Sequence, residues 1–278
     1  MKTVRYLLFI CFFFIGCNEN RDEKNPFLYE ALIRESLDYM NMPRPADSYN
    51  YPVYPGMKEW EDLTTSQAMV EACQIPQNTL HEMSTQAVIQ AIWEYPFLSE
   101  VFHRFAYQTD FEAIFLKNNA YMELIEREDA GTALFERLVL VNPLTPAPKF
   151  ESQALEILIS QTAFLSQLND DTKRKIVETA FKNDDLRQSY FNGDKSSFTY
   201  YISAAVTCLL VGMTMVAADY LPFVEAVNNN DELKFFIIGK IPKEAWDDSD
   251  SAYIYMESVY GDIPQMIISY GKKYLNIN

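Results

Sequence analysis

SSFTYYISAAVTCLLVGMTMVAA, residues 196–218, is the stretch that decides the fold of this chain. It contains no aspartate, glutamate, lysine or arginine. As an α-helix it would be about 34 Å long, at roughly 1.5 Å per residue. That length also suffices to cross a hydrocarbon layer of about 30 Å. Two interpretations therefore arise: the core helix of a soluble bundle, or a helix that spans a membrane.

The distribution of hydroxyl groups favours the soluble bundle. When residues are placed 100° apart, five hydroxyl side chains share one side of the helix, and the opposite side is apolar: Ser196, Thr199, Ser203, Thr207 and Thr214. A wide apolar arc is typical of a buried bundle helix, and serine or threonine can bond to the carbonyl four residues earlier. A spanning helix is usually richer in leucine, isoleucine and phenylalanine. In the alternative, functional interpretation, the hydroxyl stripe lines a groove.

The rest of the chain supports the same fold class. It has eight glycines in 278 residues and few alternating β-branched runs, which argues against a barrel or a sandwich. We therefore predict an all-α fold, a multi-helix bundle or irregular helical array around a central apolar helix at about 196–218.

The first residues have the pattern of a secretory signal. Two basic residues precede a short apolar run over residues 6–15, which is shorter than a typical spanning helix. The motif FIGC at residues 14–17 resembles the lipobox of bacterial lipoproteins, although Phe14 stands where leucine is usual. The resemblance implies that residues 1–16 are a signal peptide and that Cys17 is acylated, for example with palmitate. An ordinary signal peptide and an uncleaved anchor are the alternatives.

The segment after Cys17 indicates where the protein goes. Residues 17–26 are polar and are expected to form a tether between lipid and domain. Their acidic cluster resembles the surface-export signals of Bacteroidetes lipoproteins. This resemblance implies a lipid anchor in the outer membrane, with surface exposure favoured over the periplasm. The formal net charge of −16 argues against nucleic acid and anionic headgroups as partners, so we predict no nucleic-acid partner.

Proline-rich stretches divide the chain. We expect a first helical half over residues 27–141, interrupted by a proline- and tyrosine-rich extended segment at 41–56. Residues 142–148 contain three prolines and are the expected linker. Residues 149–278 are the expected second helical half, packed on the first.

Apolar periodicity predicts the individual helices. Ser84 precedes one helix, and two capping boxes are expected at Thr64 with Gln67 and at Thr109 with Glu112. Residues 233–238 fit a strand or a helix. The other expected helices cover residues 27–40, 118–127, 129–141, 150–168, 172–183, 222–227, 253–259 and 264–274.

No sequence motif carries an activity. Cys73 and Cys208 remain after Cys17, either as separate buried thiols or as a disulfide. The two histidines, His81 and His103, lack metal-site spacing, so we predict neither a metal nor another cofactor.

Aromatic residues give the best candidate for a binding surface. We predict a groove lined by Tyr51, Tyr54 and Trp60, beside the proline-rich segment. The leading functional hypothesis is a non-enzymatic binding or assembly component of the envelope, with an envelope protein or a glycan as partner. The alternative is a glycan or peptidoglycan hydrolase. Its acid pair would come from a set of glutamates: Glu94, Glu100, Glu112, Glu123 and Glu126. A third hypothesis is a membrane-embedded protein built on residues 196–218.

Overall fold

The computed structural model describes residues 44–98, 101, 107–144, 151–190, 198–238 and 249–277. Within these ranges every regular element is a helix, and none is a strand. The prediction of an all-α, irregular helical array is therefore confirmed.

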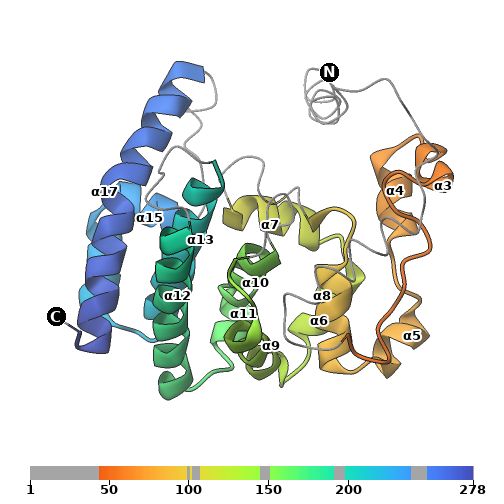
Figure 1. Cartoon of the computed structure of the whole chain (residues 1–278), viewed down its shortest axis with the longest axis horizontal. Helices are drawn as coiled ribbons and strands as arrows, with labels where there is room; N and C mark the ends of the chain where they lie inside the picture. Colours follow the sequence, from red (N-terminus) through yellow and green to blue (C-terminus); the bar gives the residue numbers. More distant parts are fainter. Residues whose placement is uncertain are drawn as a thin grey trace.

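The helices follow one another across the molecule nearly in chain order, from α3 at one end to α12, α13 and α17 at the other (Figure 1). The earlier helices are α3 (Lys58–Glu61), α4 (Ser66–Ala72), α5 (Gln77–Glu82), α6 (Thr85–Trp93), α7 (Tyr107–Phe115), α8 (Asn119–Ile125) and α9 (Ala130–Leu140). The later helices are α10 (Glu151–Ile159), α11 (Thr162–Leu165), α12 (Asp170–Tyr190), α13 (Phe198–Ala217), α14 (Leu221–Asn229), α15 (Asp231–Ile238) and α17 (Ser249–Leu275).

Helix α13 is the predicted central apolar helix. It packs against α10, α12 and α17, and it also contacts α11, α14 and α15. From Ile202 to Met215 nearly all of its side chains are buried. In the described part of the chain, no helix taken singly combines the length and the apolar character of a membrane span. Only α13 and α14 together pass that test, and they are bent by 113° at their junction.

One hydrophobic core joins the two sides of the predicted linker. Buried residues of α6, α8 and α9 belong to the same cluster as buried residues of α10, α12 and α13. Helix α9 contacts α10, α11 and α12 directly. The domain boundary at residues 142–148 stays a prediction, and residues 145–148 lie outside the described ranges.

Side-chain caps define several helix starts, and they correct two predictions. Ser84 caps α6 as predicted, because its Oγ accepts the amide proton of Ala87. The cap of α4 is Thr65 rather than Thr64, since Thr65 has the extended backbone and accepts from Ala68. Thr109 is not a cap, because α7 already begins at Tyr107.

The helices of the second half resolve one open alternative and differ from the prediction in two places. The stretch 233–238 is helical, within α15. The expected helix 150–168 is two helices, because Gln161 adopts an extended backbone and serves as the N-cap of α11. The two expected C-terminal helices are one helix, α17, which contains Pro264 in its interior. A proline removes one amide donor, and packing of α17 against α12, α13 and α15 offsets that loss.

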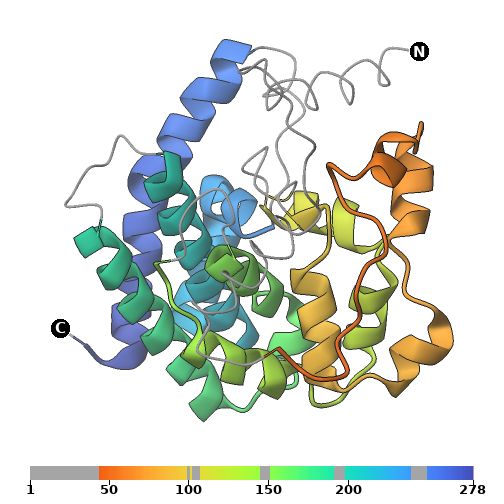
Figure 2. The same cartoon turned by 45° about the vertical axis from the view of Figure 1, so that its right-hand side comes forward.

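The proline-rich segment is extended as predicted. From Arg44 to Met57 it contains no helix, and it runs along the outside of neighbouring helices (Figure 2). Asp47 accepts the amide proton of Ser84 at 2.6 Å, and the Tyr51 hydroxyl donates to the Ala91 carbonyl at 3.0 Å. These bonds hold the segment to α6. The predictions for residues 1–43, including Cys17 and the helix 27–40, lie outside the described residues.

Candidate functional site

The predicted aromatic surface is partly buried. Tyr51 is only 3% exposed, and its ring lies 5.4 Å from that of Tyr49 and 6.3 Å from that of Tyr54. Tyr51 is thus a core residue and does not form part of a ligand surface, because its segment packs directly on α6. Tyr54 and Trp60 are half-buried, and the Trp60 ring lies 5.4 Å from Phe97. For these two residues a partner surface stays a prediction.

A buried polar cluster, which the sequence did not predict, lies between α10, α12 and α13. Arg187 of α12 is at its centre, and its side chain is 2% exposed. Its guanidinium donates to Glu156 of α10 at 2.5 and 3.2 Å, to Thr207 at 3.0 Å and to Ser152 at 3.3 Å. A further bond, of 3.2 Å, reaches the Pro143 carbonyl. Arg187 therefore links three helices and the turn after α9.

The hydroxyl stripe of α13 belongs to the core. Ser203 accepts from Gln153 at 2.8 Å, and Thr207 takes part in the Arg187 cluster. Thr214 donates to the Leu210 carbonyl at 2.7 Å, which is the predicted bond to the carbonyl four residues earlier. For these three hydroxyls the groove interpretation is wrong, because all are buried. The side chains of Ser196 and Thr199 lie outside the described set.

Asp184 lies beside this cluster and is buried. Burial in the folded state disfavours the charged form of its carboxyl group. Burial raises its pKa above the ordinary value of 3.8, although Gln188 donates to it and Arg187 attracts it. A carboxyl group with a raised folded-state pKa destabilises the fold where it is ionised, and this penalty disappears where both states are protonated.

Asp184→Asn is therefore expected to raise the melting temperature at neutral pH. The gain should shrink as the pH falls through the raised folded-state pKa, and it should vanish below the unfolded-state value. Thermal unfolding followed by circular dichroism between pH 3 and 8 measures this gain. Asp262→Asn is the control and should change little, because Asp262 is an exposed acid of α17 that does not contribute to the raised pKa of Asp184. A lower melting temperature for Asp184→Asn at pH 7 would contradict the expectation.

A second buried glutamate is also paired with an arginine. Glu94 accepts from Arg44 at 2.8 and 3.0 Å and from Gln90 at 2.8 Å. Gln90 in turn accepts from the buried Arg137, whose pKa burial lowers to about 10. The interior carboxylates Glu94 and Glu156 are therefore each held by an arginine.

His81, Cys73 and Cys208 lie in separate surroundings, and His103 lies outside the described residues. His81 contacts Glu123, with 3.1 Å between Nδ1 and Oε2. Cys73 and Cys208 are free buried thiols, and burial raises the pKa of Cys73 to about 12. This settles the alternative of a disulfide between them. Within the described ranges, no group of three metal-ligating side chains comes together.

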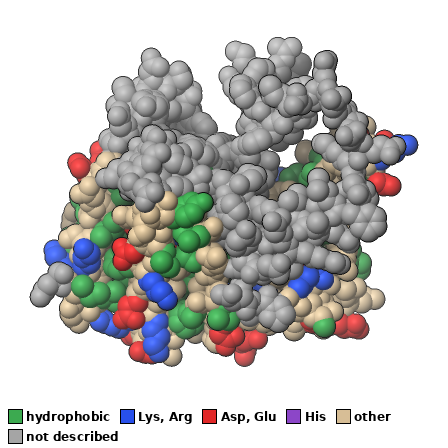
Figure 3. Space-filling view, in the orientation of Figure 1, with side chains coloured by type: hydrophobic (Ala, Val, Ile, Leu, Met, Phe, Trp, Pro, Cys, Tyr) green, Lys and Arg blue, Asp and Glu red, His purple; other side chains and the backbone are tan. Residues whose placement is uncertain are grey.

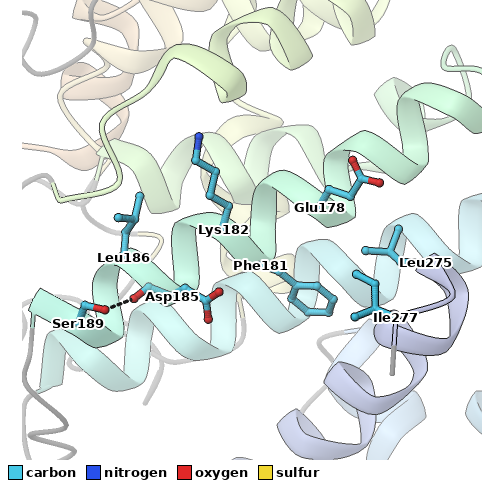
Figure 4. Close-up of a pocket in the computed structure, with 8 residues that line it drawn as sticks. All are labelled: Glu178, Phe181, Lys182, Asp185, Leu186, Ser189, Leu275 and Ile277. Atoms are coloured by element: carbon cyan, nitrogen blue, oxygen red, sulfur yellow. Dashed lines mark hydrogen bonds between the residues drawn. The ribbon is translucent and has the colours of Figure 1, made fainter.

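An open groove runs along the outer face of α12 and the C-terminal end of α17 (Figure 4). Its volume is about 430 Å³. Two apolar side chains on its walls are well exposed, Leu186 at 42% and Ile277 at 52%. We call this site the α12 groove, and it is lined by Glu178, Phe181, Lys182, Asp185, Leu186, Ser189, Leu275 and Ile277.

From the sequence alone, only the α12 side of this groove could have been predicted. Counted from Glu178, its other five α12 residues lie 3, 4, 7, 8 and 11 positions further on, a spacing that places them on one helix face. Leu275 and Ile277 lie almost a hundred positions away, and only folding brings them to this face. Figure 3 shows the result, with hydrophobic side chains and both signs of charge mixed over α12 and α17.

The α12 groove has apolar and charged side chains side by side. It combines exposed apolar side chains with a basic group, Lys182, between two acidic groups, Glu178 and Asp185. Apolar residues within a rim of charges are typical of sites that bind other proteins. No protein-family model, no curated protein and no solved structure matches this chain.

Proposed function

We propose that this protein is a lipid-anchored component of the bacterial outer envelope that binds or assembles with a partner through the α12 groove. The observation that carries the binding role is the open groove with the exposed side chains Leu186 and Ile277. The lipobox-like motif ending at Cys17 supports the anchor. The acidic cluster after Cys17 supports display at the cell surface.

The anchor is tested by Cys17→Ser in the full chain, expressed in a Gram-negative host. The wild-type protein should incorporate labelled palmitate and sediment with the outer membrane, whereas the variant should incorporate none. Protease added to intact cells then separates surface from periplasmic display. Equal labelling of the two proteins would remove the lipoprotein proposal.

The binding role is tested with a photo-crosslinking amino acid at position 186. Light should produce adducts of the full chain in the envelope when the probe replaces Leu186. The matched control places the same probe at Leu221, an exposed leucine of α14 outside the groove. Equal yields at the two positions, or no adduct at position 186, would overturn the binding role of the α12 groove.

The hydrolase hypothesis is the less favoured proposal. Two carboxylates, Glu178 and Asp185, line the α12 groove, but they lie seven positions apart along one helix. This spacing corresponds to about 10.5 Å along the axis, against about 5 to 9.5 Å for the acid pairs of glycosidases. Release of soluble sugars from peptidoglycan by the wild-type protein, abolished by Glu178→Gln, would reverse this preference.

A further inference from the structure

We infer that the helical surface beneath residues 44–56 is a peptide-binding site, which this extended segment of the same chain occupies (Figure 2). We call residues 44–56 the strap. The ligand of the site is an extended peptide of a partner protein, with a tyrosine followed by a proline, which takes the place of the strap. This second site depends neither on the lipid anchor at Cys17 nor on the α12 groove.

The strap is joined to the helices through its side chains. The backbone bonds from Ser48 to Pro45 and from Met57 to Tyr54, each of 3.1 Å, close turns within the strap or at its end. Among the residues that the structure describes, no bond between two backbone groups joins the strap to α4 or to any later helix. The strap can therefore leave the surface without breaking the hydrogen bonds of a helix.

Arg44 and Asp47 hold the first part of the strap. Arg44 donates to Glu94 at 2.8 and 3.0 Å, and Asp47 accepts the amide proton of Ser84. Both strap side chains are in contact with water, because Arg44 is 27% exposed and Asp47 is exposed. Ionic contacts that water can reach contribute little to stability. The strap therefore depends mainly on its buried side chain, Tyr51.

Tyr51 occupies a pocket at the end of α6. Its hydroxyl donates to the Ala91 carbonyl at 3.0 Å, and only 3% of the residue is exposed. Ala91 lies in the last turn of α6, where carbonyl groups lack partners within the helix. The end of α6 thus offers an acceptor that suits the hydroxyl of a tyrosine.

The same pocket contains a donor without a partner. Asn118 is 0% exposed, and its Oδ1 caps α8 by accepting from Tyr121. Its Nδ2 makes no hydrogen bond to any described residue. Burial raises the pKa values of Tyr51 and Tyr95, and the Asn118 amide beside their hydroxyl groups opposes that rise. Buried donors without partners are rare, and this one is available to a bound peptide.

Aromatic rings extend the site beyond the Tyr51 pocket. The Tyr95 ring lies 6.4 Å from the Tyr51 ring and 5.5 Å from the Phe97 ring. The Trp60 ring lies 5.4 Å from the Phe97 ring. Extended peptides with prolines bind to grooves lined by such rings. The strap itself has the composition of such a peptide, with prolines at positions 45, 52 and 55, the last two directly after a tyrosine.

Cys73 reports whether the strap opens while the helices stay folded. It is 0% exposed, and a charge on its sulfur raises the pKa values of Tyr49 and Tyr51, so it lies close to the strap. Cys208, the comparison thiol, is buried within α13. In the wild-type full chain, iodoacetamide should modify Cys73 at least tenfold faster than Cys208. Mass spectrometry of peptides measures both rates, and equal rates would overturn the inference.

A synthetic peptide of residues 44–56 tests the site directly. Its acceptor is the full chain with Arg44→Ala, Asp47→Ala and Tyr51→Ala, which we call the open-strap variant. The fluorescein-labelled peptide should bind this variant at least tenfold more tightly than wild type. In wild type the strap competes from the same chain, at an effective concentration on the order of 1 mM. Fluorescence anisotropy in detergent measures both affinities.

Two changed peptides are the controls. The peptide with Tyr51→Ala should not bind measurably. The peptide with Tyr51→Phe should bind more weakly than the unchanged one, because the Ala91 carbonyl then lacks the hydroxyl donor. In the open-strap variant, Cys73 but not Cys208 should react faster than in wild type.

Circular dichroism should show native helix content for the open-strap variant. Equal binding of the three peptides, equal affinity of wild type and variant, or no binding by a folded variant would each overturn the inference. If the variant does not fold, the two labelling rates in the wild-type chain decide.

Discussion

Arg187→Met is expected to destabilise the fold by about 3–5 kcal/mol, the usual cost of breaking a buried ion pair. The substitution would leave the Glu156 carboxylate, whose side chain is 0% exposed, without its cation. It would also remove the guanidinium N–H groups that donate hydrogen bonds to Thr207, to Ser152 and to the Pro143 carbonyl. Urea denaturation followed by circular dichroism gives the free energy of unfolding and should show this loss.

A second substitution separates the charge from the packing. Arg187→Met combined with Glu156→Leu should recover a large part of the lost stability, since replacing both partners of a buried pair by apolar residues is often neutral. Lys175→Met is the matched control, because it breaks the exposed pair with Asp171, and pairs in contact with water contribute little to stability. Equal losses for Arg187→Met and Lys175→Met would contradict a structural role for the buried cluster.

Gly131→Ala is expected to destabilise the fold by about 1–3 kcal/mol, the usual cost of overpacking. A Cβ at this position would lie 2.6 Å from the Phe164 carbonyl oxygen, so the backbone of α9 or α11 must move. That movement would also disturb the 2.7 Å bond from the Gly131 amide to Gln167. The free energy of unfolding in urea measures the effect.

Gly261 supplies the opposite control for that experiment. It lies within α17, and a Cβ there would meet no atom within 4 Å. Because alanine favours helix over glycine, Gly261→Ala should stabilise the protein by about 0.5–1 kcal/mol. Two glycine-to-alanine substitutions in helices would thus have opposite signs. A loss of stability in Gly261→Ala, or no loss in Gly131→Ala, would contradict the explanation that the atoms around the added Cβ decide the sign of the effect.

Local sequence patterns predicted the helices because a helix depends on neighbours three and four residues away. The spacing of Ile176, Val177, Ala180 and Phe181 predicts a buried stripe of α12. The first three are buried, whereas Phe181 is half-buried. Ser84 was expected at a helix start, and it caps α6. The errors occurred where distant contacts compete with local signals. Pro264 is accommodated inside α17, for example, although local rules end a helix at proline.

Only part of the candidate site could be predicted. Tyr51 is an aromatic residue in a proline-rich segment, and for that reason it was expected on a binding surface. In the fold this segment packs on α6, and the Tyr51 ring is buried. Glu94 was one of several interchangeable acids in the sequence. Its pairing with Arg44 depends on two residues 50 positions apart meeting in the fold.

The sequence by itself determined that the described part of this chain is helical and that the apolar helix α13 lies in its core, since apolar periodicity and the lack of charge act locally. Only the tertiary structure decided that Arg187 meets Glu156 and that Ile277 joins Leu186 at one groove. Contacts between residues so far apart in sequence arise from helix packing, which no short window of residues encodes.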